Sequence, residues 1–351
     1  MHKNDPLTQE QSNALKIAVF IATILVVIRH GVNLHRYYSD GSFFMPVTDA
    51  NIFIQEFLSR FTDLAIPSFF MISGFLFFLG IENIHDIGRK IKKRIYSLLL
   101  PYLLWNILLL LLIMLLLKVP VLTSLLSEKY GFTFEKFYFL QKITIFPIIG
   151  QFWYIRTLII FVCFTPLLLL IYQYRILSLF LFGLAVSFWQ PVDCRIFSTE
   201  GIVFFYLGGF IGYYQLHKTI KFQWISCFLP LMISMLIIAE LYFQLNYKFW
   251  YLRIFISVIF LFQISLYLSC KSALCKRVVH WNQYSFFIYA VHGALLAALS
   301  VGFSKLLPHT PWFSFIMFFT CILTTIFATV LGAISLRKVL PKFYNLLTGG
   351  R

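Results

Sequence analysis

The chain is short of charge, and of acidic charge above all. Only 12% of its 351 residues are charged, with 13 Asp and Glu against 29 Lys and Arg, while 60% are hydrophobic. A soluble domain needs about twice that share of charged residues. The composition excludes a soluble globular protein and predicts an all-α, polytopic integral membrane protein, because apolar runs of about 20 residues cross a bilayer as helices.

Cysteine is also scarce, and the six Cys residues form no Cys-x-x-Cys pair. We therefore expect neither a disulfide framework nor a metal site. A polar segment of domain length is missing as well, since the longest stretch between predicted spans is 118–150. We expect a single transmembrane domain over 1–351 with no appended soluble domain. The polar residues 1–13 lack the basic start of a signal peptide, so the first apolar segment is expected to stay attached.

Apolar runs between polar breaks predict ten transmembrane helices. Their predicted ranges are 15–34, 62–81, 96–117, 151–172, 177–191, 201–216, 223–243, 250–269, 283–304 and 312–336. Lys and Arg collect in alternate loops and in the C-terminal tail, which predicts that both termini are cytoplasmic. This topology, with anionic lipid headgroups as partners, explains the net charge of +16 better than nucleic-acid binding does.

His30 lies near the outer end of the first span, about 20 Å along the helix from Lys16. Ionisable groups are costly inside a membrane and usually mark function. A neutral imidazole there accepts a proton from a hydroxyl, which makes His30 a candidate catalytic base. The alternative is a side chain that reaches out to the headgroups.

Ser73 and Gly74 interrupt the apolar run of the second span. Gly has no side chain and Ser donates a hydrogen bond, so this pair permits either close helix packing or access of a ligand to the backbone.

The fourth span begins with Trp153, Tyr154 and Arg156. The two aromatic residues fit an interfacial belt. Arg156 lies inside the span and needs an anion, a carboxylate or carbonyl partners, so it is a candidate substrate-binding residue, together with Trp153.

Ser285, Tyr289 and His292 follow one another at i, i+4 and i+7 in the ninth span. They share one helix face and form a polar stripe. Such a stripe serves either hydrogen bonding between helices or contact with a substrate, for which Tyr289 and His292 are candidates.

Five cations fall within residues 89–94, directly before the third span, and end with Lys93 and Arg94. Their partner is either the lipid headgroups or a phosphorylated donor such as coenzyme A.

Several of these features come in a specific order along the chain. They are His30, the run 67–75, Lys93-Arg94 followed by 100–105, the segments 152–156, 205–209 and 285–292, and the ending 347–351. Together they resemble the acyltransferase 3 family, and the match runs along nearly the whole chain. The resemblance implies a ten-span enzyme of the bacterial cytoplasmic (inner) membrane, often an O-acetyltransferase of surface polysaccharides.

The resemblance also implies roles for single residues. The essential His of the family corresponds to His30, its Ser-Gly-Phe motif to Ser73, Gly74 and Phe75, and its donor-binding basic loop to Arg94 and its neighbours. Many members carry Arg or Lys where this chain has Val19, and Lys16 lies one turn earlier on about the same face.

We therefore expect a membrane O-acyltransferase that moves an acyl group, acetyl above all, from acyl-CoA to a hydroxyl of a cell-surface or lipid-linked glycan. No permanently bound cofactor is expected. A separate envelope-biosynthesis partner would take over the acyl group if this chain does not complete the transfer. The alternatives are a transporter for a lipid-linked sugar or an acylated metabolite, and a sensor or scaffold subunit.

Overall fold

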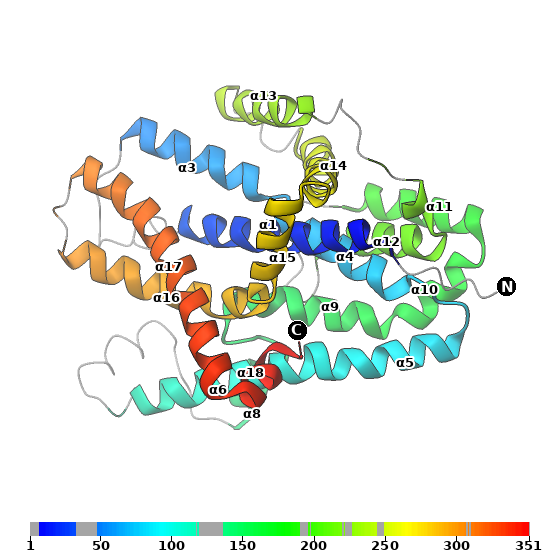
Figure 1. The fold of residues 1–351 in the computed structure, drawn as a ribbon, viewed down its shortest axis with the longest axis horizontal. Coiled ribbons are helices and arrows are strands. Elements are labelled where there is room, and N and C mark those ends of the chain that lie inside the picture. The colour runs from blue at the N-terminus through cyan, green and yellow to red at the C-terminus, as the bar shows by residue number, and fades with distance from the viewer. Residues whose placement is uncertain are drawn as a thin grey trace.

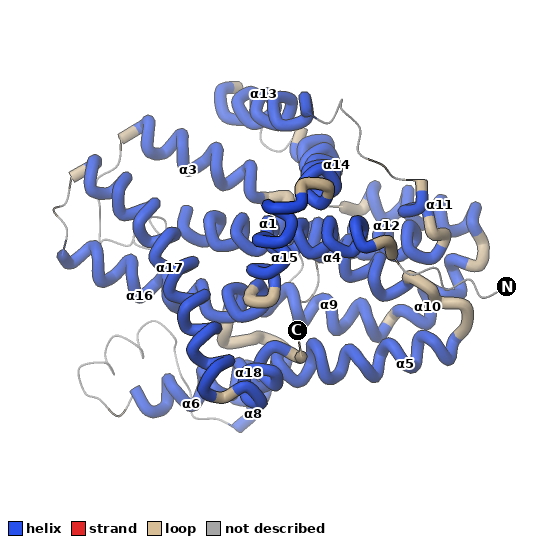
Figure 2. Tube along the Cα trace, in the orientation of Figure 1, coloured by secondary structure: helices blue, strands red, loops and turns tan. Residues whose placement is uncertain are grey.

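The structure of the protein is a computed structural model. It describes residues 7–32, 48–116, 118, 136–189, 196, 198–219, 221, 227–243, 249–306, 308 and 310–350. Within these ranges the chain forms helices and loops and no strand (Figure 2). The predicted all-α class is confirmed for the part of the chain that is described.

The helices are listed here in chain order, with η marking π- and 3₁₀-helical turns. They are α1 (Gln9–Val32), α3 (Asp49–Thr62), α4 (Ala65–Phe78), α5 (Ile84–Arg94), η1 (Ile95–Leu99), α6 (Leu100–Leu116), α8 (Lys136–Thr144), η2 (Gly150–Phe152), α9 (Trp153–Cys163), α10 (Thr165–Tyr172), α11 (Arg175–Ser187), α12 (Thr199–Tyr213), η3 (Leu216–Lys218), α13 (Leu229–Tyr242), α14 (Trp250–Ser269), α15 (Ser272–Asn282), α16 (Ser285–Leu306), α17 (Pro311–Val339) and α18 (Pro341–Thr348).

The described residues contain six continuous helical stretches long and apolar enough to cross a membrane. A seventh span results if α9 and α10, which meet at an angle of 55°, count as one. Shorter apolar helices, α11 and α13, lie where two more spans are predicted. The structure thus supports a polytopic membrane protein, while the number of ten spans and the cytoplasmic termini stay predictions.

The second predicted span, 62–81, corresponds to only part of the observed helical stretch. Helix α3 precedes α4 and carries polar residues on its buried face, among them Asn51, Gln55 and Ser59. The Thr48 side chain caps its N-terminus by accepting a hydrogen bond from the Asn51 amide at 3.2 Å. A search for apolar runs does not detect α3, because polar residues recur along it every four positions.

Helix α1 runs through the middle of the bundle and packs against α3, α4 and α14 to α17 (Figure 1). Helices α4 and α12 pack backbone to backbone beside it. A Cβ atom added to Gly208 would lie 2.0 Å from the Met71 carbonyl oxygen, and one added to Gly212 would lie 2.5 Å from that of Phe75. Small residues allow this approach, which draws α4 deep into the molecule.

The basic helix α5 is held in place at both ends. At its start, the Asn83 and Asp86 side chains form a capping box. At its end, α5 runs through the π-helical turn η1 into α6. The C-terminal helix α18 supports this junction, because the Trp105 indole donates to the Leu347 carbonyl at 3.0 Å and Gly349, at a φ of +69°, packs on Ser97. Wide π turns often occur at functional sites.

Candidate active site

A cavity of about 480 Å³ lies between α1, α4, α5, α9, α15 and α16. Side chains from all six helices and from η1 line it. Its polar lining consists of Lys16, Thr23, Ser73, Arg94, Tyr154, Asn282, Gln283, Ser285 and Tyr289. We call this space the central cavity. It brings together residues that are far apart in the sequence.

Two cations line the central cavity, and both come from segments predicted to lie toward the cytoplasm. Arg94 is half-buried at the end of α5, and Lys16 is exposed on the first half of α1. Val19 lines the cavity one turn after Lys16. Lys16 therefore places a cation in the same cavity as the position where many members of the resembled family carry Arg or Lys.

Ser73 lines the central cavity, and its neighbour Gly74 does not. The Ser73 hydroxyl lies 3.1 Å from that of Tyr154 across the cavity wall. A Cβ atom added to Gly74 would come within 2.1 Å of the Phe205 carbonyl oxygen on α12. Of the two roles open to this pair, ligand access fits Ser73 and close helix packing fits Gly74.

The polar stripe of α16 continues from the cavity toward its far end. Ser285 and Tyr289 line the cavity. The Tyr289 hydroxyl donates to the Gln151 carbonyl, and the Gln151 amide in turn donates to the Ala290 carbonyl at 3.2 Å. These bonds tie α16 to η2, the turn directly before α9, and fix the Tyr289 ring at the cavity wall.

His292 lies one turn beyond Tyr289, and its ring faces that of His30. The centroids of the two imidazoles are 5.0 Å apart. Nδ1 of His292 lies 2.8 Å from the Tyr289 carbonyl oxygen and 3.2 Å from that of Ile288. Carbonyl oxygens only accept, so this network assigns the hydrogen to Nδ1 and a lone pair to Nε2. Nε2 is buried and has no hydrogen-bond partner among the described residues.

Six of the nine predicted site residues do not line the central cavity. They are His30, Gly74 and His292, described above, and Arg156, Trp153 and Lys93. Arg156 is buried and donates to the Ile145 carbonyl at 2.8 Å. Trp153 packs its ring near Phe70, with 6.4 Å between centroids. Lys93 is exposed on α5. The structure places these three side chains outside the lining of the cavity.

The other cations of the 89–94 cluster have separate roles. Lys90 donates to the Phe77 and Leu79 carbonyls at 2.7 and 2.6 Å and so caps the C-terminus of α4. Arg89 pairs with Asp86. Lys92 is exposed. Arg94 is the member of the cluster that lines the central cavity.

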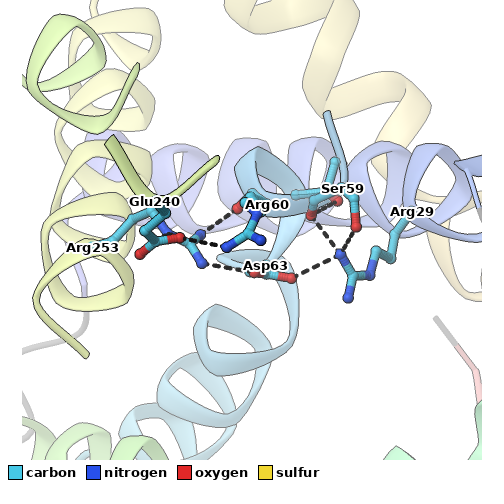
Figure 3. A network of polar contacts seen from close by, with 7 residues as sticks. Arg29, Ser59, Arg60, Asp63, Glu240 and Arg253 are labelled. Atoms are coloured by element: carbon cyan, nitrogen blue, oxygen red, sulfur yellow. Dashed lines mark hydrogen bonds and ion pairs between the residues drawn. The ribbon is translucent and has the colours of Figure 1, made fainter. Parts of the chain in front are cut away.

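A buried ion-pair network fixes the end of α1 that carries His30 (Figure 3). Arg29 pairs with Asp63 at 3.0 Å, and Asp63 also pairs with Arg253 at 3.0 Å. Glu240 accepts from Arg253 at 3.2 Å and from Arg60 at 2.9 Å. The side chains of Arg253 and Glu240 are 1% and 0% exposed. The network joins α1, α3, α13 and α14.

The sequence analysis gave no role to Arg60 or Asp63, although both belong to this network. Counting charges would have found them, since buried arginines need acidic partners. It also took Tyr154 for an interfacial aromatic and overlooked Asn282 and Gln283. Tyr154 lies one helical turn from the start of a predicted span. Interfacial aromatic residues occupy the same position, so the sequence did not distinguish a cavity residue from a belt residue.

A family model described as an acyltransferase domain matches residues 14–332. That range contains α1 from Ala14 onward, every residue that lines the central cavity and both histidines. No curated protein and no solved structure matches the chain in the corresponding searches. The match agrees with the order of motifs along the sequence and with the polar cavity that those motifs line. The chain therefore belongs to the acyltransferase 3 family and is a membrane acyltransferase.

Proposed function

We propose that the protein transfers an acyl group, acetyl above all, from acyl-CoA to a hydroxyl of a cell-surface or lipid-linked glycan at the bacterial cytoplasmic membrane. The observation that supports this best is the central cavity. Its lining includes two cations and several hydroxyl groups, and a pair of facing imidazoles lies one helical turn beyond Tyr289, outside the lining.

The donor binds at the two cations that line the cavity. Arg94 and Lys16 bind the phosphates of coenzyme A, for which a guanidinium offers paired donors. The pantetheine arm extends along α4 and α16 and brings the thioester to the region of Ser73, Tyr154 and Tyr289. Helix positions are rigid here because α4 is packed against α12 and α16 is tied to η2, and rigid walls hold reacting groups in register.

His30 acts as the base. It takes the proton from the acceptor hydroxyl, whose oxygen attacks the thioester carbonyl carbon, and the carbonyl oxygen becomes an oxyanion. The carbon–sulfur bond then breaks, an ester remains on the glycan, and the imidazolium returns its proton to the coenzyme A thiolate. The His292 ring faces that of His30, and its Nε2, which has no hydrogen-bond partner among the described residues, is available to orient the acceptor hydroxyl.

The oxyanion needs a hydrogen-bond donor, for which Ser73 and Arg156 are the candidates from the sequence. Ser73 suits the role better, because it lines the cavity and its hydroxyl is positioned by Tyr154. Arg156 donates to a backbone carbonyl instead. Ser73 supplies the oxyanion donor in the cavity. His30 and His292 do not line the cavity, but the His292 ring lies 6.0 Å from that of Tyr289, which does. The proposed reaction calls for no permanently bound cofactor.

Acetyl-CoA binding to the purified protein tests the donor site. Arg94→Gln should weaken binding by roughly tenfold, about 1.4 kcal/mol, and Lys93→Gln should weaken it less because Lys93 lies outside the cavity. The loss should grow smaller at high salt. Lys92→Gln is the matched control on the same helix and should bind normally. Equal affinities for Arg94→Gln and the control would exclude the cavity as the donor site.

Transport assays in proteoliposomes test the competing function. A transporter would move labelled lipid-linked sugar without acetyl-CoA and would tolerate Arg94→Gln. An acyltransferase would consume acetyl-CoA and release coenzyme A in proportion to the ester formed. Movement of sugar without ester formation would overturn the proposed function.

A further inference from the structure

A second cavity, of about 330 Å³, lies between α1, α4, α12 and α14, in the half of the molecule that is predicted to be cytoplasmic. We call it the lateral cavity. Each helix contributes apolar side chains to its wall, such as Leu15, Phe75, Ile211 and Phe262. Ile72 lines both this cavity and the central one, and it is buried between them. The two cavities are thus neighbours with different chemistry.

The lateral cavity extends to the surface that faces lipid. Ile259 on α14 lines it and is 52% exposed. Such an exposed apolar side chain on a long apolar helix lies against bilayer hydrocarbon. A wall with so few polar groups does not hold ordered water, since each buried water needs two to four hydrogen-bond partners. A hydrocarbon chain would pack favourably against these apolar side chains.

The polar groups in the lining lie at one end and include an imidazole with an open position. The Gln11 amide donates to the His217 carbonyl at 3.2 Å, and the Gln263 amide donates to the Lys221 carbonyl at 3.4 Å. The His217 side chain lines the cavity, and the residue is only 8% exposed. Its Nδ1 is buried and has no hydrogen-bond partner among the described residues. A buried polar atom of this kind calls for a ligand.

The mouth beside His217 is positively charged. Lys218 follows His217, Lys221 supplies the carbonyl that Gln263 contacts, and Lys271 lies over the Tyr267 ring at 4.9 Å. Glu10 is the acidic group here and accepts from the Cys270 thiol at 2.9 Å. Burial, and after it the charge of Lys218, lowers the pKa of His217, which leaves the ring neutral near pH 7 and able to donate one hydrogen bond.

We propose that the lateral cavity binds an anionic glycerophospholipid. One acyl chain fills the apolar space, the glycerol phosphate lies at His217, and the lysines at the mouth attract its negative charge. Only the Ile72 side chain separates this site from the central cavity. A bound acyl chain would therefore support the position of Ile72 in the wall of the proposed donor site. The proposal stands independently of the reaction that the central cavity carries out.

Photolabelling tests it with a defined probe. The protein in nanodiscs is irradiated with phosphatidylglycerol that carries a diazirine near the end of one acyl chain, and the labelled peptides are identified by mass spectrometry. A phosphatidylcholine probe with the same chain is the headgroup control. Phosphatidylglycerol should label the peptides that contain Ile211 and Phe262 at least about fivefold more strongly. Equal labelling by the two probes overturns the assignment to an anionic lipid.

Three variants then locate the ligand. Ile211→Trp fills the cavity and should lower labelling about tenfold, whereas Ile238→Trp, on an exposed face of α13, should leave it unchanged. The double variant Lys218→Gln, Lys221→Gln should bring labelling by the two probes close together. Unchanged labelling of Ile211→Trp, or displacement of the probe by acetyl-CoA, contradicts the proposal. If a variant does not fold, the difference in labelling between the two probes in the unmodified protein still tests the proposal.

Discussion

Replacing Gly74 with Ala tests whether the contact between α4 and α12 sets the geometry of the central cavity. The added Cβ would lie 2.1 Å from the Phe205 carbonyl oxygen, and ordinary contact begins at 3.4 Å. Backbone atoms have no alternative rotamer, so the helices must separate by about 1 Å. Overpacking costs roughly 1–3 kcal/mol, and the better helix propensity of Ala returns at most about 1 kcal/mol.

The variant should therefore unfold at lower temperature in detergent, as followed by size-exclusion profiles of heated samples. It should also lose acyl transfer beyond what the lost stability explains, because Ser73 moves with the α4 backbone and away from Tyr154. Gly183→Ala is the control, since a Cβ there meets no atom within 4 Å, and it should be neutral or slightly stabilising. If Gly74→Ala proved as stable and active as this control, the close packing described here would be wrong.

Two further predictions concern the network and the topology. Glu240→Ala removes the partner of two arginines and should destabilise the protein by about 3–5 kcal/mol. Thermal unfolding should show that the double variant Arg253→Leu, Glu240→Leu recovers part of this loss. A much smaller loss of stability in Glu240→Ala would refute a stabilising network. A reporter fused after Arg94 should be cytoplasmic and one within 118–150 should lie outside, as the Lys and Arg distribution implies; an external reporter after Arg94 would overturn the predicted span order.

The sequence was informative wherever function depends on local pattern. Apolar runs placed the span 250–269 correctly to the residue, as α14 shows. The i, i+4, i+7 stripe placed Ser285 and Tyr289 on one face, and both line the central cavity. The Ser73-Gly74 pair was recognised as an exception inside an apolar run. What the pattern left open was which of its two roles each residue takes.

The rest depended on contacts between distant segments. Arg60 lies just before the predicted span 62–81 and Asp63 at its start. Only the positions of Glu240 and Arg253 on other helices show that they belong to one ion-pair network. The facing of His30 and His292 is likewise set by how α1 crosses α16. Local periodicity carries no information on which helices cross, so neither arrangement was visible in the sequence.

The difference between Lys93 and Arg94 has the same origin. Both are cations next to each other at the end of a basic run, and adjacent residues on a helix point about 100° apart. In the structure Arg94 lines the cavity and Lys93 is exposed. Which of the two faces the cavity depends on how α5 packs against α9 and α10, which lie more than 50 residues further along the chain.

Mass spectrometry of surface glycans tests the central claim most directly. Cells that lack this protein are complemented with the unmodified chain or with His30→Ala, at matched protein levels in the membrane. The unmodified chain should add an acyl mass to the glycan, and His30→Ala should lower that modification by roughly 10²–10⁴-fold, as expected for the loss of a general base. An acyl mass present at equal levels with His30→Ala, or absent with the unmodified chain, would contradict the account.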